Sequence, residues 1–180
     1  MTEPKTRTGR PRFTGITTYR DDQGRYEFRH PWGWTRSDLE DDLAGVIALP
    51  EADDAATYFA VWVTPLDVSV VADDLDDLRD GFDEGLKALE DARIEDAQDT
   101  TYNNIIKLER TLTCTEDGAV RKRRVWALYA DTWQYLVVYQ GSTVEEYAYW
   151  LPMGNYCFTS FNLPQALWFA TDPTMEQKAE

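Results

Sequence analysis

Two short segments in the C-terminal half, 125–129 (VWALY) and 135–139 (YLVVY), carry apolar side chains at both odd and even positions. Successive side chains of a strand point to opposite faces of its sheet, so a strand with this pattern is buried on both faces. Asp131 and Thr132, which lie between the segments, are typical of a turn. We therefore predict an α+β fold, in which an antiparallel β-sheet is flanked by helices on both faces as an α/β/α sandwich.

Other segments have the composition and alternation of strands: 16–20, 26–29, 44–49, 58–63 and 104–114. The first two are separated by a run of turn residues, DDQG, which predicts a hairpin. The last alternates between apolar and polar residues, which predicts a strand with one face in water.

Two segments show helical signals. Residues 73–91 place five apolar side chains three or four positions apart, which makes one stripe on a helix: Leu75, Leu78, Phe82, Leu86 and Leu89. The aspartates of its first turns are expected to interact with free backbone amides; calcium binding is the alternative, but these acids lack the spacing and the glycine of an EF-hand. Ser142 and Glu145 have the spacing of a capping box, which predicts a second helix from there to about Trp150, before Pro152 disturbs it. One or two helical turns could restart between Gly154 and Ser160.

An aromatic turn, FRHPWGWTR, occupies residues 28–36. Pro31 and Gly33 are expected to fix a bend that aims the two tryptophans in different directions, with Trp34 in the core and Trp32 exposed. Trp and Tyr contribute strongly to protein interfaces. We therefore group four aromatic residues as a candidate partner-binding surface: Trp32, Tyr147, Trp150 and Trp168.

The formal net charge of −15 is unevenly distributed, since residues 37–100 hold twenty acidic and three basic residues. Such a surface repels nucleic acid and favours a cationic partner or simple solubility. The densest basic run is a candidate basic patch: Arg121, Lys122, Arg123 and Arg124. It could hold an acidic partner, an RNA backbone or the acidic helix of a second copy, which leaves a homo-oligomer open. The favoured interpretation is a hairpin end whose charges discourage edge pairing.

Few residues of this chain suit catalysis. His30 is the only histidine, and its position before Pro31 among aromatic residues favours a structural role over that of a catalytic base. Cys114 and Cys157 are not in a CxxC pattern and are expected to be buried thiols, so the usual zinc sets cannot form. Glycine-rich nucleotide motifs do not occur in the sequence. We expect no metal, no cofactor and no enzyme activity, although the many acids leave carboxylate-dependent catalysis open.

The sequence has no run of 18 apolar residues, and its first residues lack the apolar region of a signal peptide. We therefore expect a cytoplasmic protein that does not insert into membranes, provided that no export segment precedes residue 1.

The order of these elements resembles the PsbP-like superfamily, which includes the PsbP subunit of photosystem II, the Ran-binding import factor Mog and Eag-type chaperones. The residues that carry the resemblance are Gly24, Tyr26, Phe28, Pro31 and Trp34, followed by the closing Ser160, Phe161, Asn162 and Leu163. The resemblance covers about residues 16–163, and it implies an antiparallel sheet between helices. It divides the chain into a flexible basic arm at 1–14, a PsbP-like domain at 15–163 and a tail at 164–180.

The superfamily's members mostly bind other proteins and share no common catalytic centre. The resemblance therefore implies a non-catalytic protein-binding, adaptor or chaperone-like module whose partner is another protein. The alternative is a domain that binds a small molecule or a metal ion, or a carboxylate-dependent enzyme, with a cleft between the first helix and the sheet.

Overall fold

The computed structural model describes residues 5–39, 44–172 and 174. Within these ranges the strands are β1 (Ile16–Arg20), β2 (Glu27–Pro31), β3 (Thr35–Leu39), β4 (Ala44–Leu49), β5 (Tyr58–Pro65), β6 (Arg93–Tyr102), β7 (Ile105–Glu116), β8 (Ala119–Ala130) and β9 (Trp133–Gly141). The helices are the 3₁₀-helix η1 (Ala72–Asp74), α1 (Leu75–Lys87), α2 (Val144–Ser160) and α3 (Gln165–Ala170).

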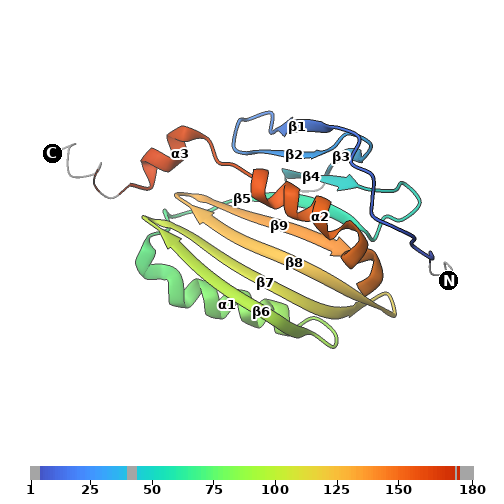
Figure 1. The fold of residues 1–180 in the computed structure, drawn as a ribbon. Coiled ribbons are helices and arrows are strands. Elements are labelled where there is room, and N and C mark those ends of the chain that lie inside the picture. The colour runs from blue at the N-terminus through green and yellow to red at the C-terminus, as the bar shows by residue number, and fades with distance from the viewer. Residues whose placement is uncertain (1–4, 40–43, 173, 175–180) are drawn as a thin grey trace.

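Seven strands form one antiparallel sheet in the order β3-β4-β5-β9-β8-β7-β6, and β1 and β2 form a separate hairpin. The hairpin and α2 lie over one face of the sheet, and α1 lies over the other (Figure 1). The predicted α+β sandwich is therefore confirmed, with the hairpin as an additional part of the α2 layer.

The two segments that are apolar at both parities lie in the middle of this sheet, within β8 and β9. Tyr135, Val137 and Tyr139 pack toward α2 and the hairpin. Leu136 and Val138 point the other way, into the clusters beneath α1. Both faces of β9 are thus covered within a single chain, as its sequence pattern predicts.

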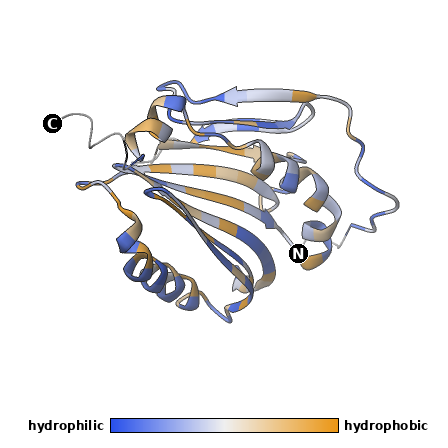
Figure 2. Cartoon of the chain, turned by 60° about the vertical axis from the view of Figure 1, so that its left-hand side comes forward, coloured by the Kyte–Doolittle hydropathy of each residue, from blue (hydrophilic) through white to orange (hydrophobic). Residues whose placement is uncertain are grey.

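Helix α1 lies on the outside of the molecule and contacts the sheet along the predicted stripe of leucines and Phe82. Its stripe is only half-buried, and the remainder of the helix is hydrophilic (Figure 2). Arg110 on β7 fastens the helix to the sheet: its guanidinium is 2.7 Å from Asp83 of α1 and 2.7 Å from Asp99 of β6.

The prediction for α2 is wrong in two respects, its N-cap residue and its interruption at Pro152. The N-cap is Thr143 rather than Ser142, because the Thr143 hydroxyl accepts the Glu146 backbone amide at 3.1 Å, while Ser142 donates to Asp54. The helix also continues through Pro152 to Ser160. Its C-terminal half buries side chains such as Cys157 and Phe158 against the sheet, and this packing outweighs the cost of an internal proline, about 3 kcal/mol.

The two edge strands, β3 and β6, were not predicted from the sequence. Both strands are almost entirely exposed, so their sequences (TRSDL and RIEDAQDTTY) lack the apolar alternation that marks a strand with one buried face.

The closing motif Ser160 to Leu163 joins α2 to the hairpin. Asn162 exchanges two backbone hydrogen bonds with Glu27 of β2, at 2.8 and 3.0 Å. The Ser160 hydroxyl accepts the Arg29 backbone amide at 2.9 Å. These bonds hold the hairpin over the C-terminal end of α2. Among the helices of the described ranges, none is long and apolar enough to cross a membrane.

Candidate functional site

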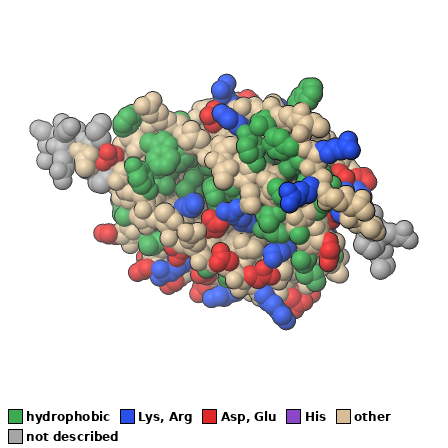
Figure 3. Space-filling model, in the orientation of Figure 1, with side chains coloured by type: hydrophobic (Ala, Val, Ile, Leu, Met, Phe, Trp, Pro, Cys, Tyr) green, Lys and Arg blue, Asp and Glu red, His purple; other side chains and the backbone are tan. Residues whose placement is uncertain are grey.

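Exposed hydrophobic side chains gather at the end of the sheet that carries α3 (Figure 3). We call this surface the α3 patch, and its residues are Val68, Val71, Tyr102, Trp168 and Phe169. Their exposed fractions run from 38% for Trp168 to 71% for Val68.

Three chain segments meet to build the α3 patch: the β5–η1 connection, the β6–β7 turn and α3. The Asn104 backbone amide donates to the carbonyl of Thr171 at 3.1 Å, and the Asn104 side chain accepts the Ala72 amide at 3.0 Å. The Tyr102 and Trp168 rings meet edge-on, with 5.6 Å between their centroids. Because these hydrogen bonds fix the backbone, the aromatic pair is presented on a rigid platform.

The turn at residues 28–36 is arranged as predicted. Trp34 is 7% exposed and lies edge-on to Trp150, at 6.2 Å between ring centroids, whereas Trp32 is 73% exposed. Pro31 and Gly33 thus separate one core tryptophan from one at the surface.

The four residues of the predicted partner-binding surface do not lie together. Trp168 belongs to the α3 patch, while Trp32 lies beside Gly15, at the start of β1. Tyr147 is 5% exposed and packs against Tyr139, and Trp150 is partly buried against the core. Tyr102 was not predicted to belong to a binding surface, although the Asn103-Asn104 turn that follows it places it near a hairpin tip.

The basic run lies along β8, and each of its side chains has a partner within the chain. Lys122 is 2.7 Å from Glu95, Arg123 is 2.5 Å from Glu116 and Arg124 is 2.6 Å from Glu109. Arg121 donates to the carbonyl of Ser142 at 2.5 Å. Three of the four positive charges of the candidate basic patch are therefore paired with a carboxylate of the same chain at 2.7 Å or less.

The side chains that could serve catalysis are shielded. His30 is 2% exposed, its Nδ1 lies 2.9 Å from the Pro31 carbonyl oxygen, and burial lowers the pKa of its imidazole. Its ring packs near Phe28, at 6.0 Å between centroids. Both cysteines are buried and free, and burial raises the pKa of the Cys157 thiol. In the described part of the chain, the Nδ1 of His30 contacts only the Pro31 carbonyl and its Nε2 has no hydrogen-bond partner, so His30 is not paired with a nucleophilic side chain.

Two hollows, of about 270 and 370 Å³, lie between the hairpin and the C-terminal end of α2. Glu27 is the acidic residue in the lining of each, and it is 3.0 Å from Arg20. Neither hollow therefore offers the carboxylate pair that glycosidase-type chemistry needs. The space between α1 and the sheet is filled by the apolar stripe. Within the described ranges, no group of three or more His, Cys, Asp or Glu side chains could hold a metal ion.

No family model matches the sequence, and no curated protein matches it. Solved structures are similar to it. Cyanobacterial PsbP (CyanoP) from Synechocystis sp. PCC 6803 is 12% identical, with a TM-score of 0.57 over 87% of this chain and 98% of that protein. LpqN of Mycobacterium tuberculosis, which is involved in cell envelope biogenesis, is 10% identical, with a TM-score of 0.57 over 83% of this chain and 91% of LpqN.

A third structure, of the protein of unknown function PA94 from Pseudomonas aeruginosa, is 12% identical, with a TM-score of 0.53 over 83% of this chain and 97% of PA94. Likeness at these identities establishes the fold and leaves the function open. The resemblance to the PsbP-like superfamily is therefore confirmed as a likeness of fold.

Proposed function

We propose that this chain, which has the PsbP-like fold, is a non-catalytic protein-binding module of the adaptor or chaperone-like kind, and that the α3 patch is its binding surface. The observation that carries the proposal is the exposed aromatic pair, Tyr102 and Trp168, held on a rigid platform among further exposed hydrophobic side chains. Clustered exposed hydrophobic residues are typical of interaction sites, and buried Trp and Tyr are frequent hot spots of binding energy.

The surroundings of the patch indicate the chemistry of its partner. Asp67 adjoins Val68 in sequence, and Asp73 and Asp74 follow Val71 closely. A complementary partner would have an apolar centre and a basic rim, because charges of opposite sign at the rim accelerate association and exclude acidic proteins.

We also propose that the protein is located in the cytoplasm. Cell fractionation followed by detection with an antibody tests this location.

The test compares two variants of the full chain. The partner is first captured from the native host and then purified, and its binding to the wild-type protein is measured by calorimetry. The double variant Tyr102→Ala/Trp168→Ala removes two side chains of the patch, and we expect its affinity to fall at least about 100-fold, because a hot spot contributes about 2 kcal/mol or more.

The matched control is Trp32→Ala, which removes an equally large exposed ring outside the α3 patch. We expect this variant to bind within about twofold of the wild type. Circular dichroism verifies that both variants are folded. A purified partner that binds the folded double variant as tightly as the wild type would show that the patch is not the binding surface.

A further inference from the structure

The N-terminal segment from Lys5 to Gly15, here called the arm, lies beside α2 and ends at the start of β1 (Figure 1). Its residues 5–14 form no helix or strand and, within the described ranges, make no backbone hydrogen bond to the rest of the chain. Arg10 and Arg12 also form no ion pair with a described residue. Residues 5–14 of the arm are therefore held by a few side chains alone.

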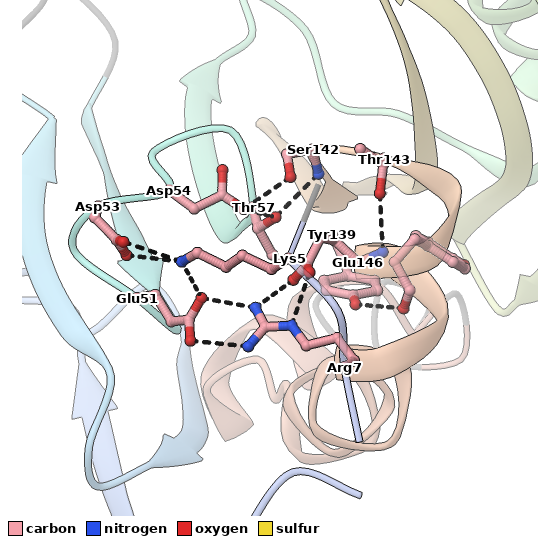
Figure 4. A network of polar contacts seen from close by, with 11 residues as sticks. Lys5, Arg7, Glu51, Asp53, Asp54, Thr57, Tyr139, Ser142, Thr143 and Glu146 are labelled. Carbon is pink, nitrogen blue, oxygen red and sulfur yellow. Dashed lines mark hydrogen bonds and ion pairs between the residues drawn. The ribbon is translucent and has the colours of Figure 1, made fainter. Parts of the chain in front are cut away.

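Arg7 makes the strongest of these contacts. Its guanidinium donates to Glu146 of α2 at 2.7 and 2.5 Å and to Glu51 of the β4–β5 loop at 3.0 and 2.7 Å (Figure 4). The same group lies over the Tyr149 ring at 4.5 Å and near the Trp150 ring at 5.6 Å. Two bidentate carboxylates with aromatic walls form a site that fits an arginine side chain closely.

The backbone that carries these carboxylates is held in place by contacts that do not involve the arm. Asp54 of the loop accepts hydrogen bonds from Thr57 at 2.6 Å and from Ser142 at 2.7 Å, which ties the loop to the start of α2. The backbone amide of Glu146 is fixed by the Thr143 cap. The domain thus positions the backbone of the site, and the arm supplies the cations that bind its carboxylates.

With the arm in place, Glu146 is 6% exposed, and among the described residues the cation paired with it is Arg7. Charge-assisted bidentate hydrogen bonds of this kind are among the stronger ones in proteins. Hydrogen bonds with Arg7 are the main cause that lowers the pKa of Glu51 to about 2. Displacement of the arm removes Arg7 from both carboxylates, and the guanidinium of another segment could form the same bidentate pairs.

A second contact lies further along the arm. The Phe13 ring meets the Tyr156 ring of α2 edge-on at 5.5 Å, although Phe13 remains 49% exposed. Lys5, two residues before Arg7, lies 2.8 Å from Glu51 and 3.0 Å from Asp53. The arm thus presents a basic residue, an arginine two positions later and an aromatic residue six positions after that.

We propose that Glu51, Glu146, Tyr149, Trp150 and Tyr156 form a binding groove for an extended basic peptide segment of another protein, and that the arm is its displaceable, autoinhibitory occupant. The peptide is recognised by an arginine and by an aromatic residue six positions later. This groove is separate from the α3 patch, so the inference does not depend on the function proposed above.

Exchange of arms between two copies is a weaker alternative. A short tether holds the arm at an effective concentration of about millimolar, far above ordinary concentrations of a second copy. A partner segment must overcome the same competition, so it needs both the arginine and the aromatic contact rather than a single charge.

The test uses the fluorescein-labelled peptide TEPKTRTGRPRFTG, which has the sequence of residues 2–15, and measures its binding by fluorescence anisotropy. A chain without residues 1–14 has the groove open, and we expect it to bind the peptide at least about 30-fold more tightly than the full-length chain does. A peptide with Arg7→Gln should bind at least about tenfold more weakly. A control peptide with Thr8→Ala, a change at an exposed position, should bind as the original does.

A second variant, full-length Arg7→Gln, keeps the chain whole if the truncated protein does not fold. It should bind the peptide more tightly than the wild type, and NMR should show the pKa of Glu51 rising from about 2 toward its ordinary value of 4.5. Failure of either folded protein to bind the peptide would overturn the proposal, as would equal binding of the Arg7→Gln peptide. A full-length dimer at micromolar concentration that becomes monomeric on truncation would show that the arm is exchanged between copies.

Discussion

Replacement of Gly154 by alanine should destabilise the protein, although alanine is the better helix former. Gly154 lies in α2 against the face of the buried Tyr139 ring, and an added Cβ would be 2.8 Å from Cγ and 2.9 Å from Cδ1 and Cδ2 of that ring. Carbon atoms in contact prefer about 3.5–4.0 Å. The ring cannot swing aside easily, because its hydroxyl donates to the Tyr147 carbonyl at 2.7 Å.

Two opposing contributions set the size of the effect. Helix propensity favours alanine over glycine by about 1 kcal/mol. Overpacking of a buried contact lowers the free energy of unfolding by about 1–3 kcal/mol. We expect a value near the upper end of this range, because the added Cβ would clash with three atoms of the Tyr139 ring. We therefore expect Gly154→Ala to lower the free energy of unfolding by about 2 kcal/mol, or Tm by about 4–8 °C for a chain of this size.

Gly81→Ala is the matched control. Gly81 is an exposed glycine within α1, and an added Cβ there would have no atom outside its own helix and immediate neighbours within 4 Å. This variant should raise the free energy of unfolding by about 1 kcal/mol through helix propensity alone. Urea unfolding followed by circular dichroism measures both variants. A Gly154→Ala protein as stable as the wild type, or more so, would refute the close packing of α2 on Tyr139.

Two further substitutions test buried polar groups. Burial lowers the pKa of His30 below its ordinary value of 6.5, so the unfolded chain binds a proton that the folded chain does not, and stability falls as the pH drops below that value. Urea unfolding at pH 7.5 and 5.5 measures this effect. The free energy of unfolding of the wild type should fall by about 1.4 kcal/mol more than that of His30→Gln for each pH unit below 6.5, down to the pKa of folded His30. Identical losses in the two proteins would show that His30 takes up its proton in the folded chain without penalty. Arg110→Met should cost about 2–4 kcal/mol, because the Arg110 side chain is 2% exposed and its loss leaves Asp83 and Asp99 without their shared cation. Arg79→Met is the control, because it removes a guanidinium that is 35% exposed, and it should lower the free energy of unfolding by less than about 1 kcal/mol. Equal losses of stability in the Arg110 and Arg79 variants would contradict the structural role of Arg110.

The parts of the fold that the sequence predicts are those in which burial determines residue type. Segment 135–139 lies between two covered faces, so every position is apolar and the pattern is unambiguous. Strand β6 is exposed along nearly its whole length, and backbone pairing to β7 places little restriction on its side chains. Edge strands of this kind leave no periodic signal in a single sequence.

The candidate sites show the same limit. The bend between Trp32 and Trp34 is local, so their different exposures follow from Pro31 and Gly33. The contact between Arg7 and Glu146 joins residues 139 positions apart, and no local pattern indicates it. Tyr147 was predicted to lie on a binding surface but is buried. An aromatic residue on a helix suits an interface or a core equally well, and only the packing of α2 against Tyr139 decides between them.

The most direct test of the two-sided sheet uses the two cysteines, one on each of its faces. Cys114 is 2% exposed within the cluster beneath α1, and Cys157 is fully buried between α2 and the sheet. Single-thiol variants, Cys114→Ala and Cys157→Ala, assign the reaction of each thiol with Ellman's reagent. We predict that each thiol in the native protein reacts at least about 1,000-fold more slowly than in urea, because each requires opening of the core. Rapid reaction of either thiol in the folded chain would show that its face of the sheet is uncovered.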